Sequence, residues 1–73
     1  MTIRQNALVE FTESYREWSL KQDTSNAPRI AAFFECDRFW CLGEIPNVAG
    51  NCLVADVDTG VIYEGAIGTF IEV

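Results

Sequence analysis

The sequence contains no histidine, and this absence removes the side chain that proteins use most often as a general base and as a metal ligand. It also has no basic residue after Arg38, and its five Lys and Arg residues stand against eleven Asp and Glu residues, for a net charge of -6. Binding to a phosphate backbone or to an anionic membrane surface depends on clustered cations. The composition therefore argues against direct binding to nucleic acid or to a membrane.

Long apolar runs are absent as well. The longest aliphatic and aromatic run covers residues 30–34, far short of the roughly 18 residues that a membrane span needs. Polar residues interrupt the first ten positions, so no apolar core of a secretory signal is recognisable there. We therefore expect a cytoplasmic protein. Its 73 residues, 49% of them apolar, predict a single folded domain over residues 1–73.

The three cysteines lack the arrangements that mark reactive or metal-binding thiols. Cys36, Cys41 and Cys52 are separated by four and ten residues, so no Cys-x-x-Cys pair is present. No histidine is available to activate them as thiolates. An odd number of cysteines without a secretion signal favours free thiols. We expect buried, reduced cysteines, with no metal and no cofactor.

Carboxylates are the remaining candidates for acid and base chemistry. Glu35 with Asp37, and Asp56 with Asp58, lie two residues apart and would share a face if they lay on strands. Such pairs are common on exposed strands. A calcium loop of the EF-hand type is not matched, because Gly60 follows too early after Asp56. We assign no catalytic residue and expect a protein that is not an enzyme.

The first third of the chain shows the period of an amphipathic helix. The pattern predicts a helix from Thr2 to Gln22, with Thr2 as its cap and the polar stretch before Pro28 as its end. Its buried stripe has apolar residues spaced three, four and three positions apart: Leu8, Phe11, Tyr15 and Trp18.

Residues 29–45 allow two interpretations. Two apolar runs flank the polar pair Asp37 and Arg38, which favours two strands of a hairpin. A second helix from Pro28 to Trp40 is the rival, since Pro28 suits a first helical turn and the alanines after it are good helix formers. The aromatic density and the short runs favour strands. Residues 46–50 are then a loop.

The last third predicts a β-hairpin. Residues 52–57 and 61–64 are rich in β-formers, and Asp58, Thr59 and Gly60 connect them, with Gly60 placed for a left-handed turn. Thr69–Val73 is expected to form a further strand, after a bend or bulge over residues 66–68. The predicted fold class is α+β, with an N-terminal amphipathic helix packed on a mainly antiparallel β-meander of about four strands.

The aromatic pairs suggest an uncovered sheet face. Phe33 with Phe34, and Phe39 with Trp40, are adjacent, and neighbouring residues of a strand point to opposite faces. One helix covers only one face, so the other needs a partner. We expect a homodimer with a twofold interface built on aromatic residues of the 33–42 region or on the terminal strand at 69–73.

These observations favour a small, acidic, non-enzymatic protein-interaction module. Residues 39–73 carry only negative charge, and this half would meet a basic protein partner, with an inhibitor or immunity-like protein as a special case. The alternative is a small-molecule binding domain with Trp18, Phe34 and Trp40 around an aromatic pocket between helix and sheet. The expected binding residues combine exposed aromatics with carboxylates: Phe33, Phe39, Trp40, Asp56, Asp58 and Glu64.

Overall fold

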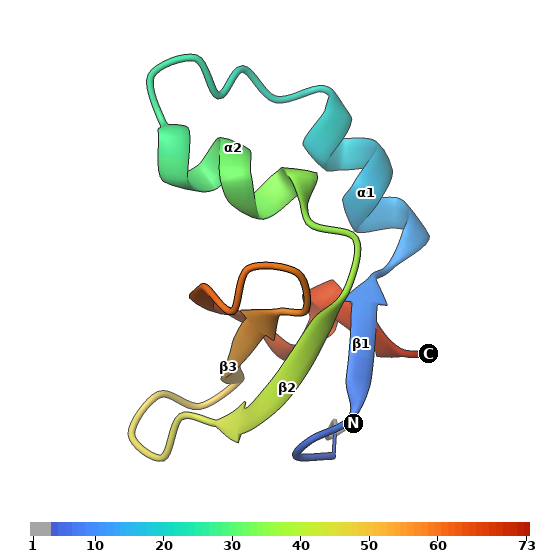
Figure 1. Ribbon diagram of the computed structural model, residues 1–73, viewed down its shortest axis with the longest axis vertical. Coiled ribbons are helices and arrows are strands. Elements are labelled where there is room, and N and C mark those ends of the chain that lie inside the picture. Colours follow the sequence, from blue (N-terminus) through green and yellow to red (C-terminus); the bar gives the residue numbers. More distant parts are fainter. Residues whose placement is uncertain (1–3) are drawn as a thin grey trace.

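The computed structural model, which describes residues 4–73, is an α+β protein with two helices and one five-stranded antiparallel sheet (Figure 1). The predicted fold class is thereby confirmed. Along the sheet the strands follow the order β4, β3, β2, β1, β5. None of the helices in residues 4–73 has the length and apolar character needed to cross a bilayer. The elements are β1 (Leu8–Phe11), α1 (Glu13–Leu20), α2 (Pro28–Glu35), β2 (Phe39–Glu44), β3 (Asn51–Asp56), β4 (Ile62–Ala66), the 3-10 helix η1 (Ile67–Thr69) and β5 (Phe70–Glu72).

The first described element is a strand, so the expected helix from Thr2 to Gln22 is wrong in its first half. Val9 and Phe11 are buried while the residues between and before them are less so, which is the two-residue period of a strand. The helix starts only after Thr12, whose hydroxyl accepts a hydrogen bond from the backbone N–H of Tyr15 at 3.2 Å. The cap expected at Thr2 lies outside the described residues.

Residues 28–35 form the helix α2, so the favoured strand interpretation of this run is wrong and its helical rival is correct here. Pro28 occupies the first turn, as the rival interpretation required. The helix ends at Glu35, well before Trp40, because Cys36 takes an extended conformation. The second apolar run is a strand, as expected, and forms β2.

The hairpin of β3 and β4 confirms the prediction for the last third. Val54 faces Tyr63 across the pair, and Gly60 has the left-handed φ of +76° that the connection requires. Residues 46–50 form the loop between β2 and β3. The predicted terminal strand is β5, and the bend before it is η1.

The sheet curls so that its two edge strands meet at one end. β4 and β5 are the opposite edges, yet only the three residues of η1 connect them, and three residues span at most about 10 Å. Gly65 of β4 lies so close to the Phe70 ring that a methyl group at Gly65 would be 2.9 Å from Cε2 of Phe70. The arrangement is therefore a small, partly open barrel.

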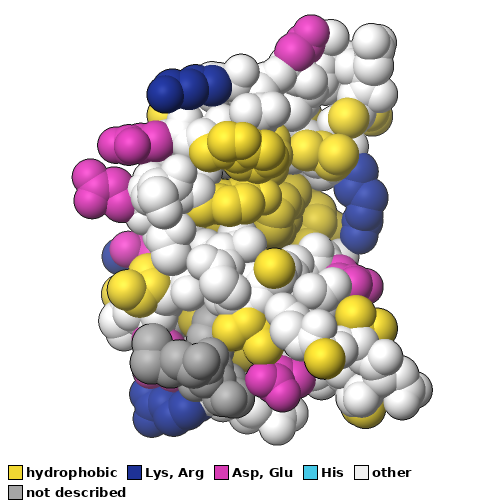
Figure 2. Space-filling view, turned by 180° about the vertical axis from the view of Figure 1, so that it is seen from behind, with side chains coloured by type: hydrophobic (Ala, Val, Ile, Leu, Met, Phe, Trp, Pro, Cys, Tyr) yellow, Lys and Arg dark blue, Asp and Glu magenta, His cyan; other side chains and the backbone are white. Residues whose placement is uncertain are grey.

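Both helices lie together at one end of this barrel (Figure 1). Phe33 of α2 reaches the interior, with its ring centroid 5.5 Å from that of Phe39 and 5.0 Å from that of Tyr63. Tyr15 of α1 packs 5.0 Å from Phe11 in the same way. Hydrophobic side chains consequently gather beneath the helices on the face opposite that of Figure 1, as Figure 2 shows. The helices thus close the barrel end with aromatic rings.

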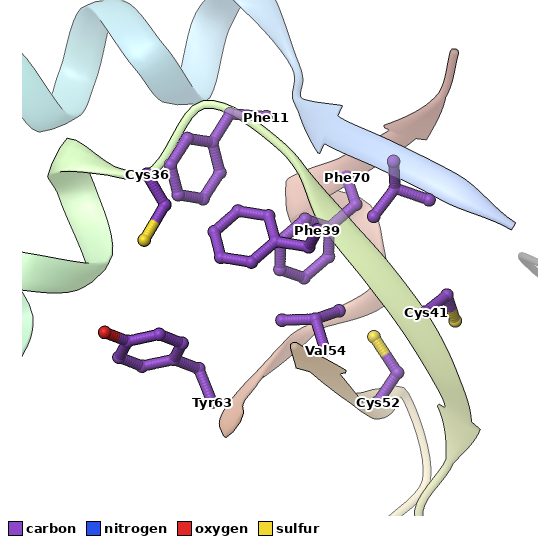
Figure 3. Close-up of a cluster of buried hydrophobic side chains, with 9 residues drawn as sticks. Phe11, Cys36, Phe39, Cys41, Cys52, Val54, Tyr63 and Phe70 are labelled. Atoms are coloured by element: carbon purple, nitrogen blue, oxygen red, sulfur yellow. The ribbon is translucent and has the colours of Figure 1, made fainter. Parts of the chain in front are cut away.

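The core lies inside the curled sheet (Figure 3). Phe39 is fully buried at its centre, and the rings of Phe11 and Phe70 approach it to 5.3 and 5.5 Å. Aromatic rings in such edge-to-face contact are favourable beyond their buried area. The buried hydrophobic residues come from every strand and from the turn after α2: Val9, Phe11, Cys36, Phe39, Cys41, Cys52, Val54, Tyr63 and Phe70.

Candidate functional site

An open cleft of about 710 Å³ lies where β1 runs into α1, beside the turn between β3 and β4. The N-terminal half of the chain and the turn residue Asp58 both contribute to it. Phe11 and Val57 supply its apolar surface. Its charged lining consists of four carboxylates and two guanidinium groups: Glu10, Glu13, Asp37, Asp58, Arg16 and Arg38.

A second, smaller cleft of about 320 Å³ lies on the other side of Asp58 and adds the carboxylate of Glu35. Asp58 therefore stands between two clefts. We call the exposed carboxylates of Glu13, Glu35, Asp37 and Asp58 the acidic surface. They belong to α1, to α2, to the segment after α2 and to the β3–β4 turn, so folding brings together charges that are up to 45 residues apart in the sequence.

The two arginines of this region are already engaged within the chain. Arg16 donates hydrogen bonds to the backbone carbonyls of Phe34 and Cys36 at the end of α2. Arg38 lies 3.8 Å from the Glu10 carboxylate. Within residues 4–73, no ion pair with Lys or Arg involves the carboxylates of the acidic surface. The region therefore carries a surplus of negative charge.

Asp56, a predicted binding residue, also lines the smaller cleft, but it is not one of the exposed carboxylates of the acidic surface. Its side chain is buried and accepts a hydrogen bond from the Thr59 hydroxyl at 2.8 Å and from the backbone N–H of Asp58 at 3.2 Å. The hydroxyl of Thr59, aided by that N–H, lowers the pKa of Asp56 even though burial opposes the shift. The hydrogen bonds to Asp56 thus stabilise the turn on which Asp58 is exposed.

Glu64 is exposed but lies apart from Asp58. Its carboxylate accepts a hydrogen bond from the Asn51 side chain at 2.9 Å on the neighbouring strand. It lines a different cleft of about 290 Å³, together with Arg29 and Phe33. Asp58 therefore lies in the acidic surface, and Glu64 does not. The other carboxylates of the acidic surface come from the first half of the chain.

The expected aromatic residues separate into core and surface. Phe39, a predicted binding residue, is completely buried in the core and does not reach the surface. Phe33 is half-buried and packs against the core. Trp40, by contrast, is 45% exposed, because it points to the outer face of β2 while its neighbours point inward.

Trp40 lies in an apolar row that crosses the outside of the sheet. It is the direct neighbour of Leu8 on β1 and of Ala55 on β3, and Ala55 is in turn opposite Ile62 on β4. Residues directly opposite each other in antiparallel strands share one face. Ile62 is half exposed, and Leu53 lies beside the row. We call Leu8, Trp40, Leu53, Ala55 and Ile62 the outer face.

The three residues expected to form one aromatic pocket do not come together. The rings of Trp18 and Phe34 lie 5.9 Å apart on the helices. Trp40 points outward from the opposite side of the sheet, since its neighbours Phe39 and Cys41 face the core that the helices cover. Packed rings of Phe11, Phe33 and other core residues fill the space between helices and sheet.

The cysteines are free and buried, as expected. Burial is the main cause that raises the pKa of Cys36 to about 11, with the nearby Asp56 carboxylate adding to the shift. The pKa of Cys52 is also about 11, mainly because of burial and then because of the neighbouring Cys41 thiol (Figure 3). These thiols are therefore protonated near neutral pH and are poor nucleophiles. Within residues 4–73, no group of three metal-binding side chains is present.

Comparisons with protein-family models, with curated proteins and with solved structures gave no match for this chain.

Proposed function

We propose that this protein is a small, non-enzymatic interaction module that presents its acidic surface to a basic partner protein. The observation that carries the proposal is the convergence of Glu13, Glu35, Asp37 and Asp58 around one turn, while both arginines nearby are engaged inside the chain. Complementary charge of this kind speeds association and selects partners of the opposite sign. Inhibition of a basic nucleic-acid-binding protein is a special case, and a cytoplasmic location remains a prediction.

The protonated thiols support the non-enzymatic part of the proposal. Cys36 is the only cysteine that borders one of the clefts described above, and its raised pKa leaves it without nucleophilic strength. The acidic surface itself offers exposed carboxylates with no histidine beside them. Electrostatic docking requires only that these charges be accessible.

The test compares two variants of equal net charge in binding to an arginine-rich peptide. One variant neutralises the acidic surface with Glu13→Gln, Asp37→Asn and Asp58→Asn, and the control neutralises the exposed residues Glu17, Asp23 and Glu44 in the same manner. We expect the first variant to bind about tenfold more weakly than the control, because three exposed ion pairs together contribute about 1.4 kcal/mol.

Salt provides a second criterion for the same proposal. Binding of the peptide to the wild type should weaken as salt rises, because exposed charges are screened over about 8 Å at physiological ionic strength. Equal loss of binding in both variants would mean that only net charge matters, and this result would contradict a localised site. Binding that does not respond to salt would contradict the electrostatic mechanism itself.

A further inference from the structure

The outer face is an apolar surface that no part of residues 4–73 covers. Trp40 is 45% exposed although it lies in the middle of the cross-strand row, and Ile62, at the β4 end of the row, is 50% exposed. An aromatic residue surrounded by aliphatic side chains and rimmed by polar ones is typical of the centre of a protein interface. Both helices pack at the barrel end, toward the core side of the sheet (Figure 1).

The charges on this face differ from those of the rest of the molecule. Its rim carries Glu10 and Arg38, which lie 3.8 Å apart. It also carries Glu64, whose carboxylate accepts a hydrogen bond from the side chain of Asn51. These three groups add up to a charge of only -1, within a chain of net charge -6. A basic partner would gain little from this face compared with the acidic surface. Two copies of this chain, in contrast, repel each other only weakly across a face of such low net charge.

The Glu10 and Arg38 pair also suits a symmetric contact. Both side chains are about half exposed. In a twofold interface, a contact between one residue of the first copy and a different residue of the second copy occurs twice, with the two copies exchanged. A rim with one charge of each sign is therefore complementary to itself. Each glutamate can then face the arginine of the other copy.

The edges of the sheet are less suited to this role. Arg29 donates a hydrogen bond to the backbone carbonyl of Ile62 at 2.7 Å and so occupies part of the β4 edge. The other edge, β5, is only three residues long, and short edge strands are a common protection against strand pairing. The edges are therefore less suited to self-association than the outer face.

The area of the outer face limits how much surface a dimer contact can bury. A stable interface buries about 800 Å² per partner, which is about one sixth of the 4987 Å² surface of this chain. Four strands, β1 to β4, carry the outer face, and with a spacing of about 4.8 Å and up to six residues each they give a curved footprint roughly 15 Å by 20 Å. This footprint is smaller than about 800 Å², so the contact reaches the area of a stable interface only when the side chains around its rim also take part.

We propose that a second copy of this chain packs on the outer face, giving a twofold homodimer centred on Trp40. The dimer goes beyond the proposed basic partner and does not depend on it. Because the remaining surface of each copy is acidic, added salt should strengthen the dimer by screening this repulsion. The acidic surface requires the opposite response from a basic ligand, so failure of either proposal can be recognised separately.

Sedimentation equilibrium at micromolar concentration tests the proposal with a matched pair of variants. Trp40→Glu places a charge at the centre of the face, and Trp18→Glu makes the same change at a half-exposed tryptophan on α1. We expect twice the 8.2 kDa monomer mass for the wild type and for the Trp18 variant. The Trp40 variant should dimerise at least about 30-fold more weakly, as at an interface hot spot.

Circular dichroism is the control that checks whether both variants are folded. Three outcomes of the sedimentation experiment would overturn the proposal. The first is a monomeric wild type at micromolar concentration. The second is a Trp40 variant that dimerises as strongly as the wild type. The third is equal weakening in both variants, which would show that added charge, rather than its position on this face, disrupts association.

Discussion

The guanidinium group of Arg16 on α1 donates a 2.7 Å hydrogen bond to the backbone carbonyl of Cys36, just after the end of α2. A second hydrogen bond goes to the carbonyl of Phe34, and the same group lies 4.6 Å from the centre of the Phe11 ring. The last carbonyls of a helix have no partner within the helix, and a cation there also favours the helix dipole. Arg16 thus joins α1, α2 and β1.

Arg16→Lys should lower the free energy of unfolding by about 1 to 3 kcal/mol, because an ammonium group does not reproduce the planar fork that reaches two carbonyls. Urea denaturation followed by circular dichroism measures this change. Arg38→Lys is the control, since Arg38 forms only a loose, exposed pair with Glu10 and should lose less than about 1 kcal/mol. Equal losses would show that Arg16 does not fasten the helices.

Phe11→Ala should destabilise the protein by about 3 to 5 kcal/mol, since it leaves a cavity among buried rings. Trp18→Ala should cost only about 1 kcal/mol, because Trp18 is half exposed. The comparison separates the observed fold from a single helical stripe, in which both residues would be buried alike. Similar shifts of the thermal transition in the two variants would contradict the strand assignment of β1.

Gly65→Ala tests the close approach of β4 and β5. The added methyl group would meet the Phe70 ring at 2.9 Å, and overpacking of this kind costs about 1 to 3 kcal/mol. Gly68→Ala is the matched control, since nothing lies within 4 Å of a methyl group there. That change should be neutral or stabilise the protein slightly by restricting the unfolded chain. A neutral Gly65 variant in urea denaturation would argue against the curled sheet.

The stability of the protein should fall as the pH rises from about 9 to about 11. Cys36 and Cys52 have ordinary pKa values near 9 in the unfolded chain and values of about 11 in the fold. Between these values the folded state binds more protons than the unfolded state, so the free energy of unfolding decreases with pH. Urea denaturation under reducing conditions at pH 8 and pH 10.5 measures the decrease.

A Cys52→Ala variant provides the control for this pH dependence. Its absolute stability drops because of the cavity, but its decrease between the two pH values should be smaller than that of the wild type. The pKa of Tyr63 is also raised by burial and contributes in the same direction in both proteins. An identical decrease in the variant would show that the Cys52 thiol is not held protonated by the fold.

Local patterns determined which parts of the fold were predictable. The β3–β4 hairpin was recognisable because Gly60 and its neighbours form a turn within a few residues of both strands. The start of the chain was misread because Leu8 and Phe11 fit a helical spacing, while Val9 and Phe11 fit a strand equally well. Thr12 followed by Glu13 was the signal that could have shown where the helix starts.

The helix α2 shows how contacts far along the chain decide between two local possibilities. Phe33 and Phe34 suggested a strand, but on the helix Phe33 reaches Phe39 while Phe34 reaches Trp18 on α1. Arg16 then satisfies carbonyls at the end of this helix. Neither contact follows from the residues of the segment alone, so the sequence left the choice open.

The acidic surface was only partly predictable for the same reason. Asp58 was expected from the charge of the C-terminal half, whereas Glu13, Glu35 and Asp37 reach it only through the packing of the helices beside the β3–β4 turn. A count of charges along the chain gives the sign of a surface. Its position depends on the fold.

The pairing of β1 with β5 has a consequence for how the chain folds. Val9 lies opposite Glu72, and Phe11 lies opposite Phe70, so these contacts close a loop of almost the entire chain. Pairing over such a distance slows folding, because the entropy of loop closure is lost before any contact forms. On the ribosome, Val9 and Phe11 must wait for residues 70–72 to emerge before β1 acquires β5 as its second neighbour. Until then, this apolar strand edge is open to other chains.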